Sequence, residues 1–212
     1  CDDDMTANYT YPSCEGIAEN GCSWTQCSVD DVAFSAALVQ EVSANVCIDS
    51  ERVYAVGGSN GGMFVWDLGR DAQSAEVFTA VAPILGLPHR GYLDPPISEG
   101  GMPVISITGS RDRTVPPGDW EQESFTTTSD GDVYYYSSAS AITRVWAESH
   151  GCDTTVPAES IDVGSSSMEC RGWSYCQSDS QWPPVLDCRG DMGHMYNLSS
   201  SWPLMLDFFE QL

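Results

Sequence analysis

Lysine is absent from this chain of 212 residues, and its eight basic side chains are all arginines. Aspartate and glutamate together number 31, which gives a formal net charge of -23 at pH 7. A surface with this charge repels phosphate groups. We therefore expect neither nucleic acid nor an anionic membrane as a partner.

Long apolar runs are also missing. The longest candidate, Val77 to Leu87, is interrupted by Pro83 and Gly86, and it is shorter than the roughly 18 apolar residues that a membrane-spanning helix needs. We therefore expect no membrane insertion. The hydrophobic content of 42% is enough to bury one substantial core, so length and composition favour a single domain over residues 1–212.

Histidine is scarce, and this limits how the nine cysteines can be used. None of His89, His150 and His194 lies at zinc-ligand spacing from a cysteine pair, so we expect no metal site. Disulfides formed in an oxidising compartment are the better interpretation, and they predict a secreted protein. Two sequons, at Asn8 and Asn197, agree with secretion and are candidate glycosylation sites.

The positions of the cysteines suggest a partial disulfide pattern. We expect Cys152 to pair with Cys170 or Cys176, because these residues flank the same late segment. Three early cysteines are expected to pair locally or with Cys47: Cys14, Cys22 and Cys27. Because nine is an odd number, one cysteine lacks a partner within the chain. Cys1 is our candidate for a disulfide to another segment.

Strand-like and helix-like stretches alternate along most of the chain. Residues 1–27 are acidic, cysteine-rich and aperiodic, and they predict a disulfide-pinned loop region. Four apolar runs predict buried strands over residues 52–57, 77–84, 103–109 and 184–188. Helices are predicted over residues 29–45, with an N-cap at Ser28, 60–68, ending near Gly69, 138–151, with Gly151 as its stop, and 200–212. This order predicts an α/β fold with a mostly parallel sheet.

The run "YAVGGSNGGMFVW" at residues 54–66 contains a G-x-S-x-G motif centred on Ser59. A nucleophile elbow needs such glycines because the turn from strand to helix leaves no room for a Cβ atom, and its serine is strained. Chance also produces this short motif in a chain rich in glycine and serine. The strand predicted before it and the helix predicted after it favour a nucleophile over a plain glycine-rich turn.

A serine nucleophile needs a base and an acid to orient that base. His194 follows the last predicted strand and is the candidate base. His150 ends a helix, where a positive charge is favourable, and His89 lies in a loop that we expect at the surface. Asp112 follows a predicted strand by one short turn and fits the chain order serine, acid, histidine. Asp191 is the rival acid.

Several blocks of the sequence together resemble a known family. The run "CSVDDVAFSAALVQEVSANVCIDSERVYAVGGSNGGM" is followed in order by "AVAPILG", "PVISITGSRDRTVP", "RVWAESHGC" and "DMGHMYN". These blocks resemble the secreted polyhydroxybutyrate-depolymerase-like esterases, a group that includes feruloyl and acetylxylan esterases, and the resemblance covers about residues 28–212. It implies an α/β-hydrolase fold and no cofactor. It also implies Ser59 as nucleophile, Asp112 as acid, His194 as base and the backbone of Asn60 as an oxyanion donor.

The chain departs from this family in two places. Tyr196 is followed by Asn197, whereas family members often have an aromatic residue and a proline there. Tyr196 is a candidate substrate-binding residue, and this difference affects the expected shape of the cleft. The family also has strands and an oxyanion-hole loop upstream of anything present here. We therefore expect a domain that is incomplete at its N-terminus, with an upstream segment or a second chain completing the sheet, and Cys1 is the candidate link to it.

Two functions are compatible with the sequence. The first is a secreted serine ester hydrolase that acts on polyester, feruloyl or acetyl esters. The second is a catalytically idle structural or binding protein of an extracellular assembly, which the acidity, the cysteines and the sequons would suit. An intact set of serine, acid and histidine favours the enzyme.

Overall fold

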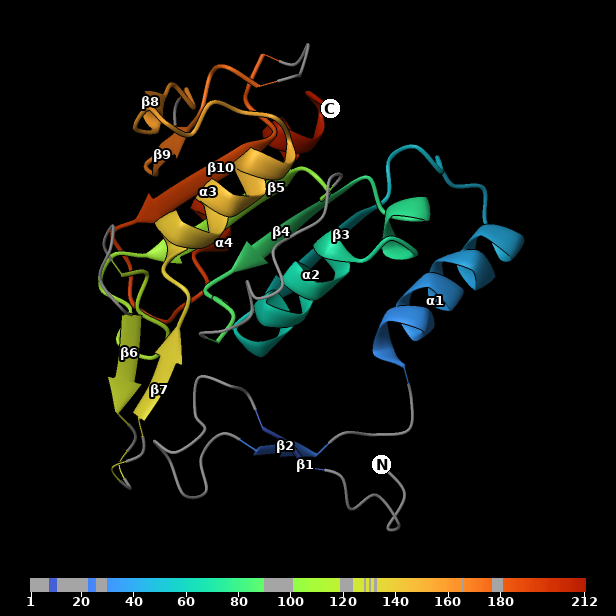
Figure 1. Cartoon of the computed structure of the whole chain (residues 1–212). Coiled ribbons are helices and arrows are strands. Elements are labelled where there is room, and N and C mark those ends of the chain that lie inside the picture. The colour runs from blue at the N-terminus through green and yellow to red at the C-terminus, as the bar shows by residue number, and fades with distance from the viewer. Residues whose placement is uncertain are drawn as a thin grey trace.

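The structure is a computed structural model, which describes residues 8–10, 23–25, 30–89, 101–118, 124–127, 129, 131, 133–164, 166–176 and 181–212. At its centre lies a six-stranded sheet of order β3-β4-β5-β10-β9-β8 (Figure 1). The first four strands in this order are parallel, β9 pairs antiparallel with β10, and β8 pairs antiparallel with β9. The fold is thus mixed α/β with a mostly parallel central sheet, as the sequence predicts.

The predicted strands form the parallel part of the sheet. They are β3 (Tyr54–Gly58), β4 (Ala80–Ile84), β5 (Val104–Gly109) and β10 (Val185–Gly190). The sequence analysis missed the two antiparallel strands, β8 (Glu159–Ile161) and β9 (Glu169–Gly172). Both are short and carry exposed residues, so they lack the continuous apolar run that marks the buried strands.

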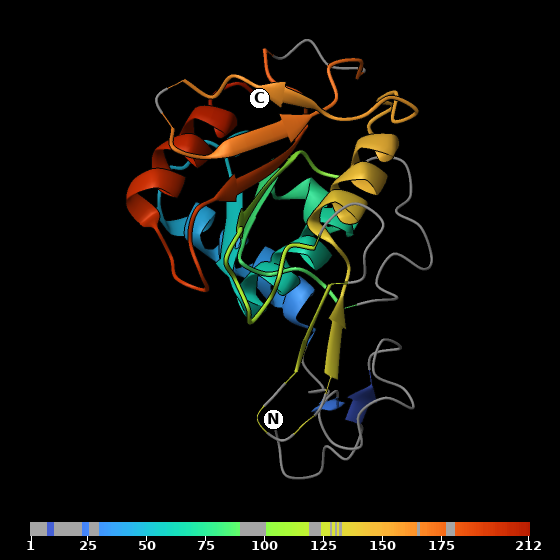
Figure 2. The same ribbon diagram turned by 90° about the vertical axis from the view of Figure 1, so that its left-hand side faces the viewer.

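Two small two-stranded sheets lie outside the central one. The first pairs β1 (Asn8–Thr10) with β2 (Ser23–Thr25), and the second pairs β6 (Ser124–Thr127) with β7 (Val133–Tyr136). None of these four strands was predicted. The β6–β7 ribbon extends away from the central sheet (Figures 1 and 2).

Helices cover both faces of the central sheet. The helices α2 (Asn60–Arg70) and α3 (Ala139–Ser149) share one hydrophobic cluster with the sheet, and α4 (Leu198–Phe209) belongs to a second cluster. Strand alternation explains this division, because Val104 faces the first cluster and the next residue, Ile105, faces the second. Figure 2 shows α3 and α4 on opposite sides of the strands.

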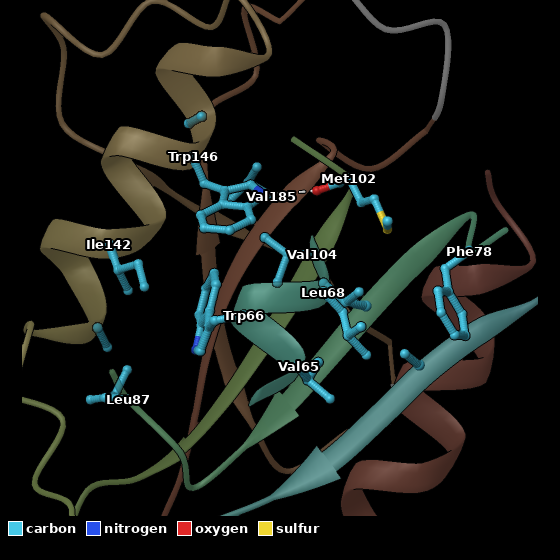
Figure 3. Close-up of a cluster of buried hydrophobic side chains, with 14 of the residues drawn as sticks. Val65, Trp66, Leu68, Phe78, Leu87, Met102, Val104, Ile142, Trp146 and Val185 are labelled. Carbon is cyan, nitrogen blue, oxygen red and sulfur yellow. Dashed lines mark hydrogen bonds between the residues drawn. The ribbon is translucent and has the colours of Figure 1, made fainter. Parts of the chain in front are cut away.

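Two tryptophans join α2 and α3 above the sheet (Figure 3). The rings of Trp66 and Trp146 make an edge contact with their centroids 4.8 Å apart. Each buried indole N–H has a partner: Trp146 donates to the carbonyl of Met102 at 2.8 Å, and Trp66 donates to the carbonyl of Gly86 at 3.0 Å. Satisfied polar atoms make such burial favourable, so these contacts fix α2 on the sheet.

Helix α1 (Asp31–Asn45) begins later than predicted. Its N-cap is Asp30, whose carboxylate accepts hydrogen bonds from the backbone N–H groups of Val32 and Ala33, both at 3.0 Å. The predicted N-cap at Ser28 is wrong, because Asp30 performs this role. Val32 and Val39 pack against the core, but no residue of α1 is fully buried.

Two glycines near helix ends have different roles. Gly151 has a φ of 67° just after His150 ends α3, which confirms the predicted stop. Gly69 does not end α2, which continues to Arg70. A Cβ atom at Gly69 would lie 2.9 Å from a methyl group of Val81, so glycine allows close packing of the helix on β4 there. Among the described helices, which also include the short η2 (Ser74–Glu76), none is long and apolar enough to cross a membrane.

Two disulfides lie in the described residues. Cys152 pairs with Cys176, which confirms one of the two predicted alternatives. Cys170 pairs with Cys188, the residue directly opposite it across strands β9 and β10. Cys47 is an exposed free thiol, so its predicted pairing with an early cysteine is wrong. It follows α1 in an exposed stretch of chain. The predictions for Cys1, Cys14, Cys22 and Cys27 lie outside the described residues.

Candidate active site

Ser59 occupies a tight turn between β3 and α2. Its backbone has φ 54° and ψ -121°, an unfavourable conformation for a residue with a Cβ atom, as expected for a nucleophile elbow. Its N–H donates to the carbonyl of Ile84 at 2.9 Å, which fixes the turn to the end of β4. The strained turn presents the serine hydroxyl at the carboxyl end of the sheet.

The glycines of the motif differ in how much they are needed. A Cβ atom at Gly57 would lie 2.3 Å from the carbonyl oxygen of Gly61, and one at Gly58 would lie 2.2 Å from the ring of Tyr196. At Gly61 a Cβ atom would meet no described atom within 4 Å. The steric argument therefore holds on the strand side of Ser59, and the described neighbours do not require glycine at position 61.

The structure brings Ser59, His194 and Asp112 together in one hydrogen-bonded chain. The Nε2 atom of His194 lies 2.9 Å from the Ser59 hydroxyl oxygen. The Nδ1 atom of the same ring lies 2.7 Å from a carboxylate oxygen of Asp112. The three residues come from the loops that follow β3, β5 and β10. This is the arrangement in which a histidine can take a proton from a serine while a carboxylate orients the ring.

Asp112 is held in a closed environment. Its side chain is fully buried, and the carboxylate oxygen that does not face His194 accepts backbone N–H groups from Thr114 at 2.8 Å and Val115 at 3.0 Å. Hydrogen bonds of this kind favour the charged form of a carboxylate and fix its orientation. The Asp112 carboxylate is therefore directed at the imidazole by its own loop.

The loops that carry the acid and the histidine lie against each other. The N–H of Ser110 donates to the carbonyl of Gly190 at 2.9 Å, and the N–H of Arg111 donates to the carbonyl of Met192 at 3.0 Å. A Cβ atom at Gly109 would lie 2.4 Å from that same Met192 oxygen. The parallel pairing of β5 with β10 thus continues beyond the strands and sets the spacing between the two loops.

The remaining histidines and the rival acid lie elsewhere. Asp191 is exposed and pairs with Arg111, with 2.7 Å between the Arg111 Nε and an Asp191 carboxylate oxygen, and no hydrogen bond joins it to His194. His150 is the C-cap residue of α3, as expected, and burial lowers its pKa. His89 is only 3% exposed and its ring stacks on Tyr136, so its expected surface position is wrong.

Tyr136 is a residue near the site that the sequence analysis missed. Burial raises its pKa to about 12, and electrostatic interactions with Tyr134 and Asp112 add to this effect. The segment after β4 turns inward against β7, and this places His89 on the Tyr136 ring. The run of three tyrosines at residues 134–136 was the available signal, but its contacts come from distant parts of the chain.

Asn60 is the first residue of α2, directly after Ser59. The first backbone bond between Ser59 and its helix runs from the Met63 N–H to the Ser59 carbonyl at 3.0 Å. The N–H groups of the preceding helical residues have no partner within an α-helix, and the positive end of the helix dipole lies there. The first turn contains no acidic residue to neutralise it. This end of α2 can stabilise a negative charge next to the serine.

The other predicted residues lie near the histidine loop or outside the described side chains. The Tyr196 ring packs over Gly58 and remains 53% exposed, beside the turn that carries Ser59. Asn197 is exposed and is the N-cap residue of α4. Asn8 belongs to β1, and its side chain lies outside the described part of the structure. In the described ranges no group of three or more His, Cys, Asp or Glu residues could hold a metal ion.

Known proteins similar to this chain were found by sequence. NocK, a protein of Nocardia uniformis subsp. tsuyamanensis, is 37% identical over 90 residues, which cover 41% of this chain and 24% of NocK. Feruloyl esterase B of Piromyces equi is 26% identical over 152 residues, which cover 68% of this chain and 26% of that protein. Both carry the name esterase. The chain spans about a quarter of the length of these two relatives.

A solved structure has a similar fold. The acetyl xylan esterase from Aspergillus awamori matches with a TM-score of 0.57 and 15% identity, over 84% of this chain and 67% of that one. At this identity the likeness concerns the fold alone. No protein-family model matches the chain. Taken together, the similarities support a relationship to esterases.

Proposed function

We propose that this chain is the catalytic part of a serine carboxylic ester hydrolase with an α/β-hydrolase fold. The observation that carries the proposal is the hydrogen-bonded chain from Ser59 through His194 to Asp112, at 2.9 and 2.7 Å. It lies at the carboxyl ends of three parallel strands, where open α/β sheets bind their ligands. The esterase names of two relatives agree with this chemistry.

The proposed reaction uses each group in turn. The Ser59 hydroxyl oxygen attacks the ester carbonyl while His194 takes its proton, and the resulting imidazolium is stabilised by Asp112. His194 then delivers the proton to the leaving alcohol, and water hydrolyses the acyl-enzyme by the same steps. The backbone N–H of Asn60 at the start of α2 stabilises the oxyanion, a contribution of about 3 kcal/mol for one donor in comparable enzymes. This scheme requires no cofactor.

We further propose a secreted enzyme that acts on polyester, feruloyl or acetyl esters, of the polyhydroxybutyrate-depolymerase-like group. The two disulfides suit an oxidising compartment, and Asn197 is an exposed sequon residue. Tyr196, half exposed beside Ser59, is the proposed contact for the substrate. The names feruloyl esterase and acetyl xylan esterase in similar proteins are the reason to test these esters first.

We also propose that residues 1–212 belong to one domain whose sheet continues beyond β3. Among the described strands, β3 pairs only with β4, so its other edge is open. Apolar side chains are exposed on helices at both faces of the sheet: Phe34, Leu38 and Val42 on α1, and Leu198, Trp202 and Leu206 on α4. An open edge between two such helices suits a further strand that is apolar on both faces. A polypeptide segment beyond these residues is our candidate, and a disulfide from Cys1 stays a prediction.

A fluorophosphonate probe tests the enzyme. We expect the intact protein to be labelled and Ser59→Ala to remain unlabelled, because the probe reacts only with an activated serine. Ser43→Ala, which changes an exposed serine on α1, serves as the matched control and should keep its labelling. A folded intact protein that is neither labelled nor active on a panel of polyester, feruloyl and acetyl esters would favour the idle binding protein instead.

A further inference from the structure

We infer that Arg189 is a positioning residue that holds the Asp112 loop in place relative to the strand that leads to His194. Its guanidinium bridges two groups. One nitrogen donates to the carbonyl of Gly118 at 3.0 Å, and another lies 3.0 Å from a carboxylate oxygen of Asp187. The inference rests on the proposed function of the site, and it adds a residue that touches neither the substrate nor the triad.

Asp187 fixes the position of the Arg189 guanidinium. It lies two residues before Arg189 on β10, so both side chains are on the same face of the sheet. The Asp187 side chain is only 8% exposed, and that of Arg189 is 25% exposed. Burial raises the pKa of Asp187, and the charges of Arg189 and then Arg171 oppose this effect. A planar guanidinium held by a buried carboxylate has little freedom to move.

Gly118 lies in the loop that follows β5, on the C-terminal side of Asp112. The near end of this loop is already joined to the histidine loop through the N–H of Arg111 and the carbonyl of Met192. The Arg189 bond adds a second connection, on the other side of Asp112, to the end of β10, the strand that leads to the histidine loop. Arg111, before Asp112, is therefore bonded to the histidine loop, and Gly118, after Asp112, is bonded to β10.

The part of the loop between Arg111 and Gly118 contains the hydrogen bonds that orient Asp112. Within it, the N–H groups of Thr114 and Val115 orient the Asp112 carboxylate, which meets His194 at 2.7 Å. Without the Arg189 bond the loop is still held by the bond from the Ala139 N–H to the Pro117 carbonyl, at 2.8 Å, but it loses this connection to β10. We expect the Asp112 carboxylate then to move relative to the His194 ring. Small displacements of catalytic groups reduce turnover more than substrate binding when the displaced group does not contact the substrate.

The variant Arg189→Lys keeps the positive charge of the side chain and changes its shape. Arg189→Lys keeps a positive charge for Asp187, but one ammonium group on a flexible stem is a poor bridge to two fixed acceptors. We expect kcat to fall about tenfold with KM changed by less than about twofold. Arg144→Lys is the matched control, because it makes the same change in an exposed pair with Glu148 on α3, and kcat should stay within about twofold of the parent value.

A double variant distinguishes positioning from folding. Arg189→Met alone leaves the buried Asp187 carboxylate without its partner and should lower the denaturation midpoint. Adding Asp187→Asn removes that charge, and we expect the midpoint to recover while kcat stays low. A return of kcat to the parent value in the double variant, or unchanged kcat in a folded Arg189→Lys protein, would overturn the inference.

A spectroscopic measurement keeps the inference separate from the esterase proposal. The proton between the His194 Nδ1 atom and Asp112 should give a low-field NMR signal in the parent protein, and we expect it to broaden or disappear in Arg189→Lys but not in Arg144→Lys. If the parent protein hydrolyses no ester, the proposed function fails, while this signal still tests the bridge. An unchanged signal in Arg189→Lys would count against the positioning role.

Discussion

The two sides of the parallel sheet differ sharply in how their strands are enclosed. Every residue of β5 is buried, and β10 next to it has five buried residues out of six. At the other side, β3 has an open edge among the described strands, and Val56 on it is 39% exposed. Asp112 and His194 follow the enclosed strands, whereas Ser59 follows the open one. The strands that lead to Asp112 and His194 are thus enclosed by described parts of the protein. The turn that carries Ser59 is instead held by β4 and α2.

The largest expected effect concerns the enclosed side. Asp112→Asn should reduce kcat/KM by about 10⁴-fold, because an amide can leave the histidine in the wrong tautomer while its shape is preserved. Asp191→Asn is the matched control. Its exposed pair with Arg111 contributes little, so we expect a change of less than about twofold. Hydrolysis rates on one chromogenic ester compare the two, and equal losses would show that burial does not identify the acid.

A second expected effect compares the two sides by stability. Leu186→Ala, in the buried part of β10, should lower the free energy of unfolding by about 2–5 kcal/mol, because it removes packed methyl groups and leaves a cavity. Val56→Ala, at the open edge, should cost less than about 0.5 kcal/mol. Urea unfolding measures both. A cost above about 1 kcal/mol for Val56→Ala would mean that this strand is covered in the folded protein, as a further segment of the sheet would require.

The smallest expected effect is a dependence of stability on pH. Burial lowers the pKa of His89, so below its ordinary value of about 6.5 the unfolded chain binds a proton that the folded chain does not. The free energy of unfolding should therefore fall as pH drops below about 6.5, by up to about 1.4 kcal/mol per pH unit for this residue. His89→Gln should show a shallower fall in urea unfolding at pH 7.5, 6.5 and 5.5. If the free energy of unfolding fell equally with pH in both proteins, the His89 ring would be exposed rather than buried.

The features that the sequence predicts best depend on residues that are neighbours along the chain. The continuous apolar runs around Val81, Ile105 and Leu186 predict buried strands, and the order of strands predicts which loops share one edge of the sheet. That order is why Ser59, Asp112 and His194 could be selected before their distances were known. The glycine stop at Gly151 is likewise a local property of the chain.

Features that depend on distant contacts could not be predicted in this way. His89 is buried because β7 packs against it, and nothing next to His89 in the sequence indicates this. The bridge from Arg189 to Gly118 spans 71 residues. The antiparallel strands β8 and β9 are too short to show a hydrophobic period. The pairing of Cys170 with Cys188 depends on the register of β9 against β10, which the spacing of cysteines does not contain.

The contact between Tyr196 and Gly58 has a consequence for how such sequences can change over time. Because a methyl group at position 58 would lie 2.2 Å from the Tyr196 ring, a larger residue at position 58 requires that the Tyr196 side chain move or be replaced by a smaller one. Relatives with a bulkier residue before the nucleophilic serine should have a smaller side chain, or a displaced loop, two positions after the histidine. The two positions should therefore co-vary among homologous sequences, although Tyr196 lies 138 positions after Gly58 along the chain.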